Sequence, residues 1–112
     1  MSRQFTITPV DQTFTLSADG EIFATEVRAK SLSEGDYPSV LYFEPEDIDM
    51  SKFSKSDHST HCPSKGNASY YDLTTSHQIH ENVAWVYENP FSSASEIKGY
   101  MGFYPAIIAT PN

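Results

Sequence analysis

Apolar residues recur at every second position in short runs that are separated by turn residues. This period is typical of β-strands with one buried face. Residues 13–17 alternate in this way, and residues 21–24 do so in part. Asp19-Gly20 lies between the two runs, and such a pair favours a two-residue hairpin turn because both turn positions take a positive φ. The pattern predicts an antiparallel hairpin with three inward-facing side chains, those of Phe14, Leu16 and Ile22.

The rest of the chain continues this pattern, with room for one or two short helices. Strands are predicted over residues 25–31, 40–43, 68–73, 82–87 and 104–109, and Val83, Trp85 and Tyr87 are expected to share one face. Residues 74–81 are expected to connect two of these strands as a hairpin. Proline and two acids favour a brief helix at residues 45–47. Ser93 and Glu96 match a capping box for a helix that ends near residue 99. The expected fold is mostly antiparallel β.

A polar stretch interrupts the predicted strands at residues 51–67, where serines are frequent and a proline and a glycine occur. A structureless segment of this length is unusual inside a compact domain and is often functional. We therefore interpret residues 51–67 as a functional loop.

Size and charge narrow the class of protein. The 112 residues suffice for one domain over residues 1–112, with fifteen acidic residues, seven basic residues and a net charge of −8. This balance argues against binding to nucleic acid or anionic membranes. No apolar run has the length of a signal peptide core or a membrane span. One cysteine allows no intramolecular disulfide. We expect a soluble cytoplasmic protein without a cofactor, either a monomer or a homodimer paired through exposed sheet edges.

The densest set of reactive side chains lies in residues 57–66, which contain the only thiol, Cys62, with His58, His61 and Lys65. One hypothesis is a nucleophilic cysteine with a histidine as its base. The alternative is an inert cysteine packed under a loop, with Lys65 at the surface. Sequence distance does not decide between them, because such pairs are recognised by their geometry.

Two further patterns could bind a metal ion, and each has a simpler interpretation. His58/His61 and His77/His80 are both spaced three apart, but residues three apart on a strand point to opposite faces. Asp47 and Asp49 could hold Mg²⁺ beside a nucleotide, yet they fall on a predicted turn or short helix. We interpret both sets as solvated surface residues and predict no metal site.

Three segments of the chain resemble the family called domain of unknown function 427. They cover residues 42–48, 60–70 and 81–90, and they include the motifs Cys-Pro-x-Lys-Gly and Ala-Trp-x-Tyr-Glu. Asp49 and Asn89 depart from the common family pattern. Seven residues match it, namely Thr60, Cys62, Lys65, Gly66, Tyr70, Trp85 and Tyr87.

The resemblance implies a small β-tent-like or barrel-like domain. The family that the chain resembles also carries a nucleotidyltransferase-like label. Relatives of that fold hold zinc through two CxxC pairs, which one cysteine cannot supply. Gly66 is expected to take a conformation that disfavours a Cβ. An amine at Lys65 is expected to pair with a carboxylate, for which Glu34, Asp57 and Glu88 are candidates.

These observations favour a domain that binds a small polar or anionic ligand in a cleft beneath the loop at residues 56–66. The expected ligand contacts are Thr60, Cys62, Lys65, Tyr70, Trp85 and Glu34, with Cys62 and Lys65 as candidate catalytic groups. Alternatives are a cysteine-dependent enzyme, a nucleotidyltransferase-like enzyme, and a module whose acidic surface binds a basic protein partner.

Overall fold

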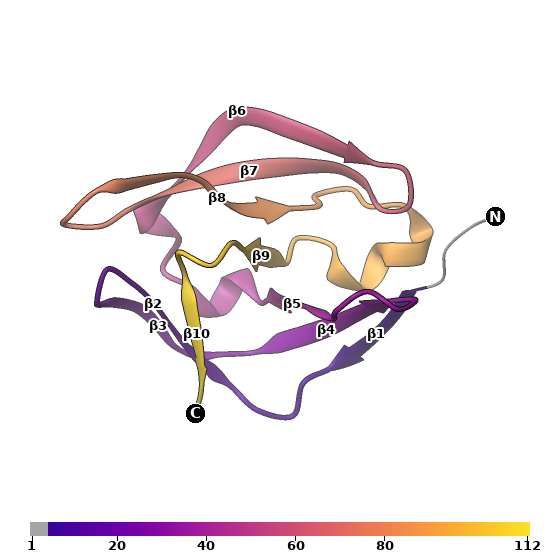
Figure 1. Ribbon diagram of the computed structural model, residues 1–112, viewed down its shortest axis with the longest axis horizontal. Coiled ribbons are helices and arrows are strands. Elements are labelled where there is room, and N and C mark those ends of the chain that lie inside the picture. The colour runs from indigo at the N-terminus through magenta and orange to yellow at the C-terminus, as the bar shows by residue number, and fades with distance from the viewer. Residues whose placement is uncertain (1–4) are drawn as a thin grey trace.

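Ten strands form two antiparallel sheets in the computed structural model, which describes residues 5–112 (Figure 1). The larger sheet has the strand order β1-β4-β5-β9-β8-β7-β6, and the smaller has the order β10-β2-β3. The expectation of a mostly antiparallel β fold is confirmed. The strands are β1 (Phe5–Pro9), β2 (Phe14–Ala18), β3 (Glu21–Val27), β4 (Ala29–Glu34), β5 (Val40–Phe43), β6 (Phe53–Cys62), β7 (Gly66–Thr74), β8 (Ile79–Val86), β9 (Met101–Phe103) and β10 (Ile108–Pro111).

The β2–β3 hairpin forms where Asp19-Gly20 predicted it, with φ angles of 53° and 77° at the two turn residues. Phe14 and Leu16 are buried as expected, but the inward orientation predicted for Ile22 is wrong. The two-residue turn pairs Ile22 with Ser17, whose side chain faces outward between the buried Leu16 and Ala18, so Ile22 faces outward as well. The irregularity beside this pair breaks the alternation one residue later and leaves Phe23 and Ala24 both buried.

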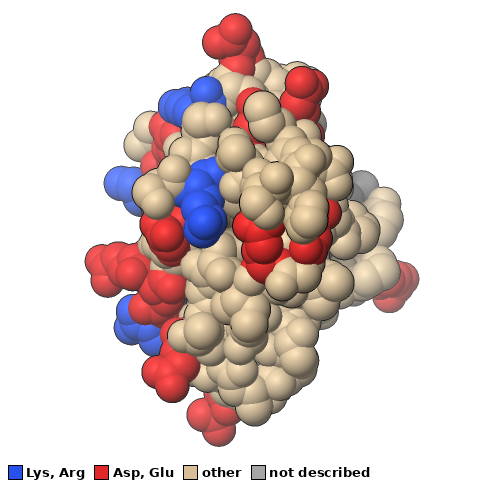
Figure 2. All heavy atoms as spheres, turned by 90° about the vertical axis from the view of Figure 1, so that its left-hand side faces the viewer, with Lys and Arg blue, Asp and Glu red and all other residues tan. Residues whose placement is uncertain are grey.

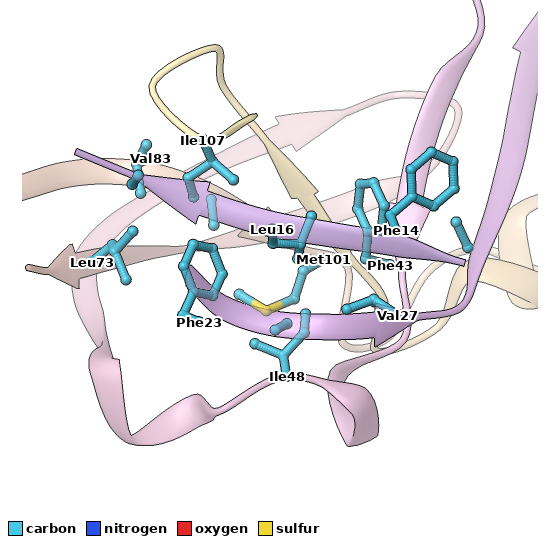
Figure 3. Close-up of a cluster of buried hydrophobic side chains, with 14 of the residues drawn as sticks. Phe14, Leu16, Phe23, Val27, Phe43, Ile48, Leu73, Val83, Met101 and Ile107 are labelled. Carbon is cyan, nitrogen blue, oxygen red and sulfur yellow. The ribbon is translucent and has the colours of Figure 1, made fainter. Parts of the chain in front are cut away.

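One hydrophobic core fills the space between the small sheet and one face of the large sheet. Figure 3 shows Leu16 and Val27 of the small sheet beside Phe43 and Met101 of the large one. Phe14 meets Phe43 edge to face at a centroid distance of 5.5 Å. This core joins the two sheets.

A second core lies on the opposite face of the large sheet, beneath a short helix. Alternation along β8 divides the side chains, since Ala84 and Val86 belong to the first core whereas Trp85 packs against the second. Val83 belongs to the first core, so the prediction that it shares a face with Trp85 is wrong. A register irregularity and a positive φ of 52° at Asn82 break the alternation just before Val83. The buried members of the second core are Leu32, Tyr42, Ala68, Tyr70, Tyr87, Ala94 and Ile97.

The helices in the described residues are three short 3₁₀ segments, η1 (Pro45–Asp47), η2 (Met50–Lys52) and η3 (Ser92–Ile97). None of them is long and apolar enough to cross a membrane. The helix at residues 45–47 was predicted. The predicted capping box of Ser93 and Glu96 is wrong, because Phe91 is the N-cap of η3 and makes no side-chain cap bond. The Ser93 hydroxyl instead donates to the Ser64 carbonyl at 3.1 Å.

The segment at residues 51–67 is not a loop. It forms η2, the edge strand β6 and a tight turn into β7. An edge strand exposes its side chains and must resist pairing with other chains, which polar and charged residues and a bulge achieve. The irregularity between Lys55 and Ser59 is such a device. The polar composition therefore reflects the position at the edge of the sheet.

Other strand boundaries also differ from the predicted ones. The strand predicted at residues 25–31 divides into the end of β3 and the start of β4, and the strand predicted at 104–109 begins later, as β10. The three-residue strand β9 was not predicted. The expected hairpin between β7 and β8 is present, closed by a hydrogen bond from the Thr75 amide to the Gln78 carbonyl at 2.9 Å.

Polar contacts tie the tips of the β2–β3 and β7–β8 hairpins together, at the left of Figure 1. The Asp19 carboxylate accepts from the Thr75 hydroxyl at 2.6 Å and lies 2.8 Å from His80 Nε2. Glu21 accepts from the Ser76 amide at 2.9 Å. The Thr75 and His80 hydrogen bonds lower the pKa of Asp19, and the Ser76 hydroxyl and amide lower that of Glu21.

We predict that Asp19→Asn lowers the melting temperature at pH 7. A carboxyl with a lowered folded-state pKa stabilises the fold above its unfolded pKa of about 4, and this stabilisation is lost as the pH falls through the folded value. The difference between wild type and variant should therefore shrink below pH of about 4. Thermal melts at several pH values provide the measurement. Asp36→Asn, at an exposed position, is the control. If the difference in melting temperature between wild type and Asp19→Asn does not change with pH, the charge of Asp19 does not stabilise the fold.

Candidate functional site

The predicted ligand contacts come from both halves of the large sheet. Thr60 and Cys62 lie on β6, and Lys65 lies in the turn that leads to β7. Tyr70 and Trp85 follow on β7 and β8, whereas Glu34 ends β4 in the other half. The structure brings these residues together in two groups, one around the Lys65 amine and one around the aromatic rings.

The Lys65 amine lies between an acid and a thiol. Its Nζ is 3.3 Å from Glu34 Oε1 and 4.0 Å from Cys62 Sγ. Only 13% of the Lys65 side chain and 14% of the Glu34 side chain are exposed. The Phe5 ring covers the amine with its centroid 5.0 Å away. Of the three carboxylates considered for Lys65, Glu34 is the partner, while Glu88 pairs with Lys55 at 2.9 Å.

The local backbone explains why the thiol and the amine converge. Cys62 pairs with Gly66 across the β6–β7 turn, and the Lys65 amide donates to the Cys62 carbonyl at 3.2 Å. Gly66 has φ of 115°, a region that residues with a Cβ rarely adopt, as the family resemblance implied. The Phe91 amide donates to the Lys65 carbonyl at 2.8 Å and fixes the turn from outside.

Trp85 lies flat across the neighbouring strand. It pairs with Gly102, and a Cβ placed on that glycine would lie 2.5 Å from two carbons of the indole ring. The indole N–H donates to the Tyr42 hydroxyl at 3.3 Å, and the Tyr104 ring lies 4.8 Å away between centroids. Because Tyr104 is exposed and Trp85 is partly so, this aromatic surface reaches solvent.

Tyrosine hydroxyls lie between the two groups. Burial raises the pKa of Tyr42, with Cys62 and Glu34 as further contributors, and burial likewise raises the pKa of Tyr87. Both phenols therefore stay neutral at physiological pH and can donate hydrogen bonds. The Tyr70 hydroxyl lies 3.0 Å from Thr60 Oγ1. The site thus combines one cation with several neutral donors.

The histidines of residues 57–66 point to other partners. His61 Nδ1 lies 2.7 Å from Asn67 Oδ1, and the His58 ring packs on Tyr70 with centroids 4.6 Å apart. The contacts of Cys62 run instead to Lys65 and the second core. The hypothesis of a cysteine–histidine pair gains no support from this arrangement.

The two metal patterns are likewise dispersed. His80 lies 2.8 Å from Asp19 and His77 lies 3.9 Å from Glu21, whereas His58 packs on Tyr70 and His61 lies beside Asn67. Asp47 holds the Arg28 guanidinium through two contacts of 2.9 and 3.1 Å, whereas Asp49 caps η2 by accepting from the Ser51 amide. No three His, Cys, Asp or Glu side chains within residues 5–112 are grouped to hold a metal ion.

Sequence reasoning missed Tyr42, Tyr104 and Gly102 as parts of this site. Tyr42 was read only as one residue of a buried strand. A glycine between two apolar residues was a usable signal, because an isolated strand glycine often marks close approach by another group. Recognising it would have required knowledge of the pairing between β8 and β9.

We predict that Gly102→Ala lowers the free energy of unfolding by about 1–3 kcal/mol, the usual range for overpacking. The added methyl group would overlap the Trp85 ring. Chemical denaturation followed by circular dichroism provides the measurement. In a Trp85→Leu background the same change should cost much less, and equal costs in both backgrounds would contradict the contact.

Comparison with known proteins places the chain in a family. The search of curated proteins finds no match. A family model described as Domain of unknown function (DUF427) matches residues 6–110, nearly the whole chain, as the resemblance indicated. The chain therefore belongs to the DUF427 family.

Proposed function

We propose that the protein binds a small polar or anionic ligand on the face of the large sheet that holds Lys65 and Trp85. The earlier expectation of a cleft beneath a loop is revised, because residues 56–62 belong to β6. The proposed site lies where the β6–β7 turn meets the end of β4. The description of the DUF427 family assigns no activity.

The position of the Lys65 amine is the observation that supports this proposal most. A largely buried ion pair adds little net stability compared with apolar side chains of similar volume. Lys65 and Glu34 are largely buried on a small domain that already has two apolar cores. Stability alone therefore does not account for an ammonium group at this place.

Each residue has a distinct role in the proposed complex. Lys65 supplies a charge-assisted hydrogen bond to an anionic or carbonyl oxygen, and Glu34 orients the amine. Thr60 and Tyr70 supply hydroxyl groups, and the Cys62 thiol borders the amine. Trp85 offers an apolar wall against which a planar part of the ligand can stack. The proposal is one of binding and includes no reaction step.

We predict that anionic probes stabilise the wild type through Lys65. Thermal melts with inorganic phosphate, succinate or adenosine monophosphate should show a rise in melting temperature with at least one probe. At ten times its Kd, that probe should add about 1.4 kcal/mol to the free energy of unfolding. Lys65→Met should lose this rise, and it should also melt below the wild type without ligand, because it removes the cation that faces the largely buried Glu34 carboxylate. Lys98→Met, at an exposed lysine, is the matched control and should keep it.

Three outcomes would contradict the proposal. Wild type that responds to none of the probes would exclude the anionic class. A Lys65→Met variant that keeps the full rise, or that unfolds while Lys65→Arg also binds nothing, would assign the amine to the architecture alone.

We further predict that iodoacetamide modifies Cys62 in the native protein, because this thiol is partly exposed and borders the proposed site. A probe that stabilises the wild type should slow the modification. Mass spectrometry of the intact chain measures the rate, and Cys62→Ser is the blank. Full protection of Cys62 until unfolding would remove the thiol from the ligand site.

A further inference from the structure

The Tyr87 hydroxyl is a hydrogen-bond donor without an acceptor in the part of the chain that the structure describes. The residue is only 8% exposed, yet its hydroxyl makes no hydrogen bond within residues 5–112. Every fully buried side-chain nitrogen or oxygen of these residues has a partner. The Tyr87 hydroxyl is therefore not sealed in the core and opens onto space that a small molecule can reach. A buried phenol usually finds a partner, so this one is available to a ligand.

The groups near this hydroxyl are those of the ligand site proposed above. Tyr87 belongs to the second core together with Tyr42 and Tyr70, and the Cys62 side chain packs against the same core. Burial raises the pKa of Tyr87, and so do Tyr42 and Cys62 through their charges, which puts these groups within electrostatic range of one another. The Cys62 sulfur in turn lies 4.0 Å from Lys65 Nζ. The thiol therefore has both the Lys65 amine and the Tyr87 phenol in its surroundings.

Two different donors thus meet in a largely buried place. The Lys65 ammonium supplies one positive charge, whereas the Tyr87 phenol is neutral and donates a hydrogen bond. A carboxylate matches this pair, because it accepts through two oxygens and carries a single negative charge. An anion with two charges, such as a phosphate monoester, loses more hydration when it is buried, and one ammonium group compensates that loss less well.

The charge of the whole protein also favours a ligand of low charge. The chain has a net charge of −8, and Figure 2 shows acidic side chains spread over the end of the molecule that holds the two hairpin tips. The potential of an acidic protein repels an approaching anion, and this repulsion grows with the charge of the anion. A doubly charged ligand is therefore disfavoured both on approach and on burial.

We propose that the ligand is a small, singly charged aromatic carboxylate, one oxygen of which binds the Lys65 amine while the other accepts from the Tyr87 hydroxyl. This inference rests on the site proposed above and adds Tyr87 to it as a binding residue. The aromatic part of the ligand follows from Trp85, whose indole N–H bonds to the Tyr42 hydroxyl and whose ring lies beside the exposed Tyr104. These rings extend from the hydroxyl groups to solvent and offer a surface on which a ring can stack.

Fluorescence of the single tryptophan, Trp85, gives a direct readout of binding at this place. Benzoate and phenylphosphonate are matched probes, because they carry the same ring on a singly charged and, at mildly alkaline pH, a doubly charged head group. We expect benzoate to bind the wild type at least tenfold more tightly than phenylphosphonate. This comparison uses the unmodified chain and does not depend on the folding of any variant.

Tyr87→Phe removes the hydroxyl and keeps the ring. The melting temperature without ligand should stay unchanged, because the hydroxyl has no hydrogen bond within residues 5–112. Benzoate binding should weaken at least tenfold, as expected for the loss of a hydrogen bond to a charged group. Tyr71→Phe is the matched control, since Tyr71 packs against the first core on the other face of the sheet and its hydroxyl lies 3.5 Å from Glu88. This variant should bind benzoate like the wild type.

The outcomes separate this inference from the proposed site itself. Benzoate binding that Tyr87→Phe leaves intact would overturn the role of Tyr87, and phenylphosphonate that binds as tightly as benzoate would overturn the singly charged class. If phosphate or adenosine monophosphate stabilises the wild type through Lys65 while benzoate does not bind, the site stands and this inference fails. If none of these anions binds, both fail.

Discussion

The three residues of β9 hold the two halves of the large sheet together. β9 lies between β5 and β8, and it pairs with β5 only through Phe43 and Met101. Met101 is fully buried in the first core, and Gly102 supports the Trp85 ring on the opposite face. One short strand thus serves both cores. Because Gly102 has no side chain, the Trp85 ring can lie against it, so the aromatic part of the site depends on the same strand that joins the two halves of the sheet.

Much of the fold could be predicted from local pattern. The Asp19-Gly20 turn, the strand at residues 40–43 and the hairpin between β7 and β8 were evident, because turn chemistry and alternation act over a few residues. β9 was missed since three residues carry no periodicity. Ile22 was misplaced because its orientation follows from its pairing with Ser17 across the turn, and Ser17 faces outward. β6 was mistaken for a loop because the composition of an edge strand resembles that of a loop.

The candidate site was predicted in part. A tight turn brings Cys62 and Lys65 close, and that much is local. The approach of Glu34 from the other half of the sheet is a property of the tertiary fold, and the family resemblance rather than any spacing pointed to Lys65 as a residue that needs a carboxylate. Tyr42, whose hydroxyl accepts the Trp85 hydrogen bond, was recognisable only from the packing. The ligand contacts themselves stay a proposal.

The contacts between the two hairpin tips have a consequence for folding. Asp19 and Glu21 contact Thr75 and Ser76, which follow more than fifty residues later in the chain. Closing so long a loop costs conformational entropy before any contact forms, which slows folding. Once both hairpins are in place, neither tip can fray without releasing the other. Amide protons at this end should therefore exchange with solvent through one shared opening event, although the tips belong to different sheets.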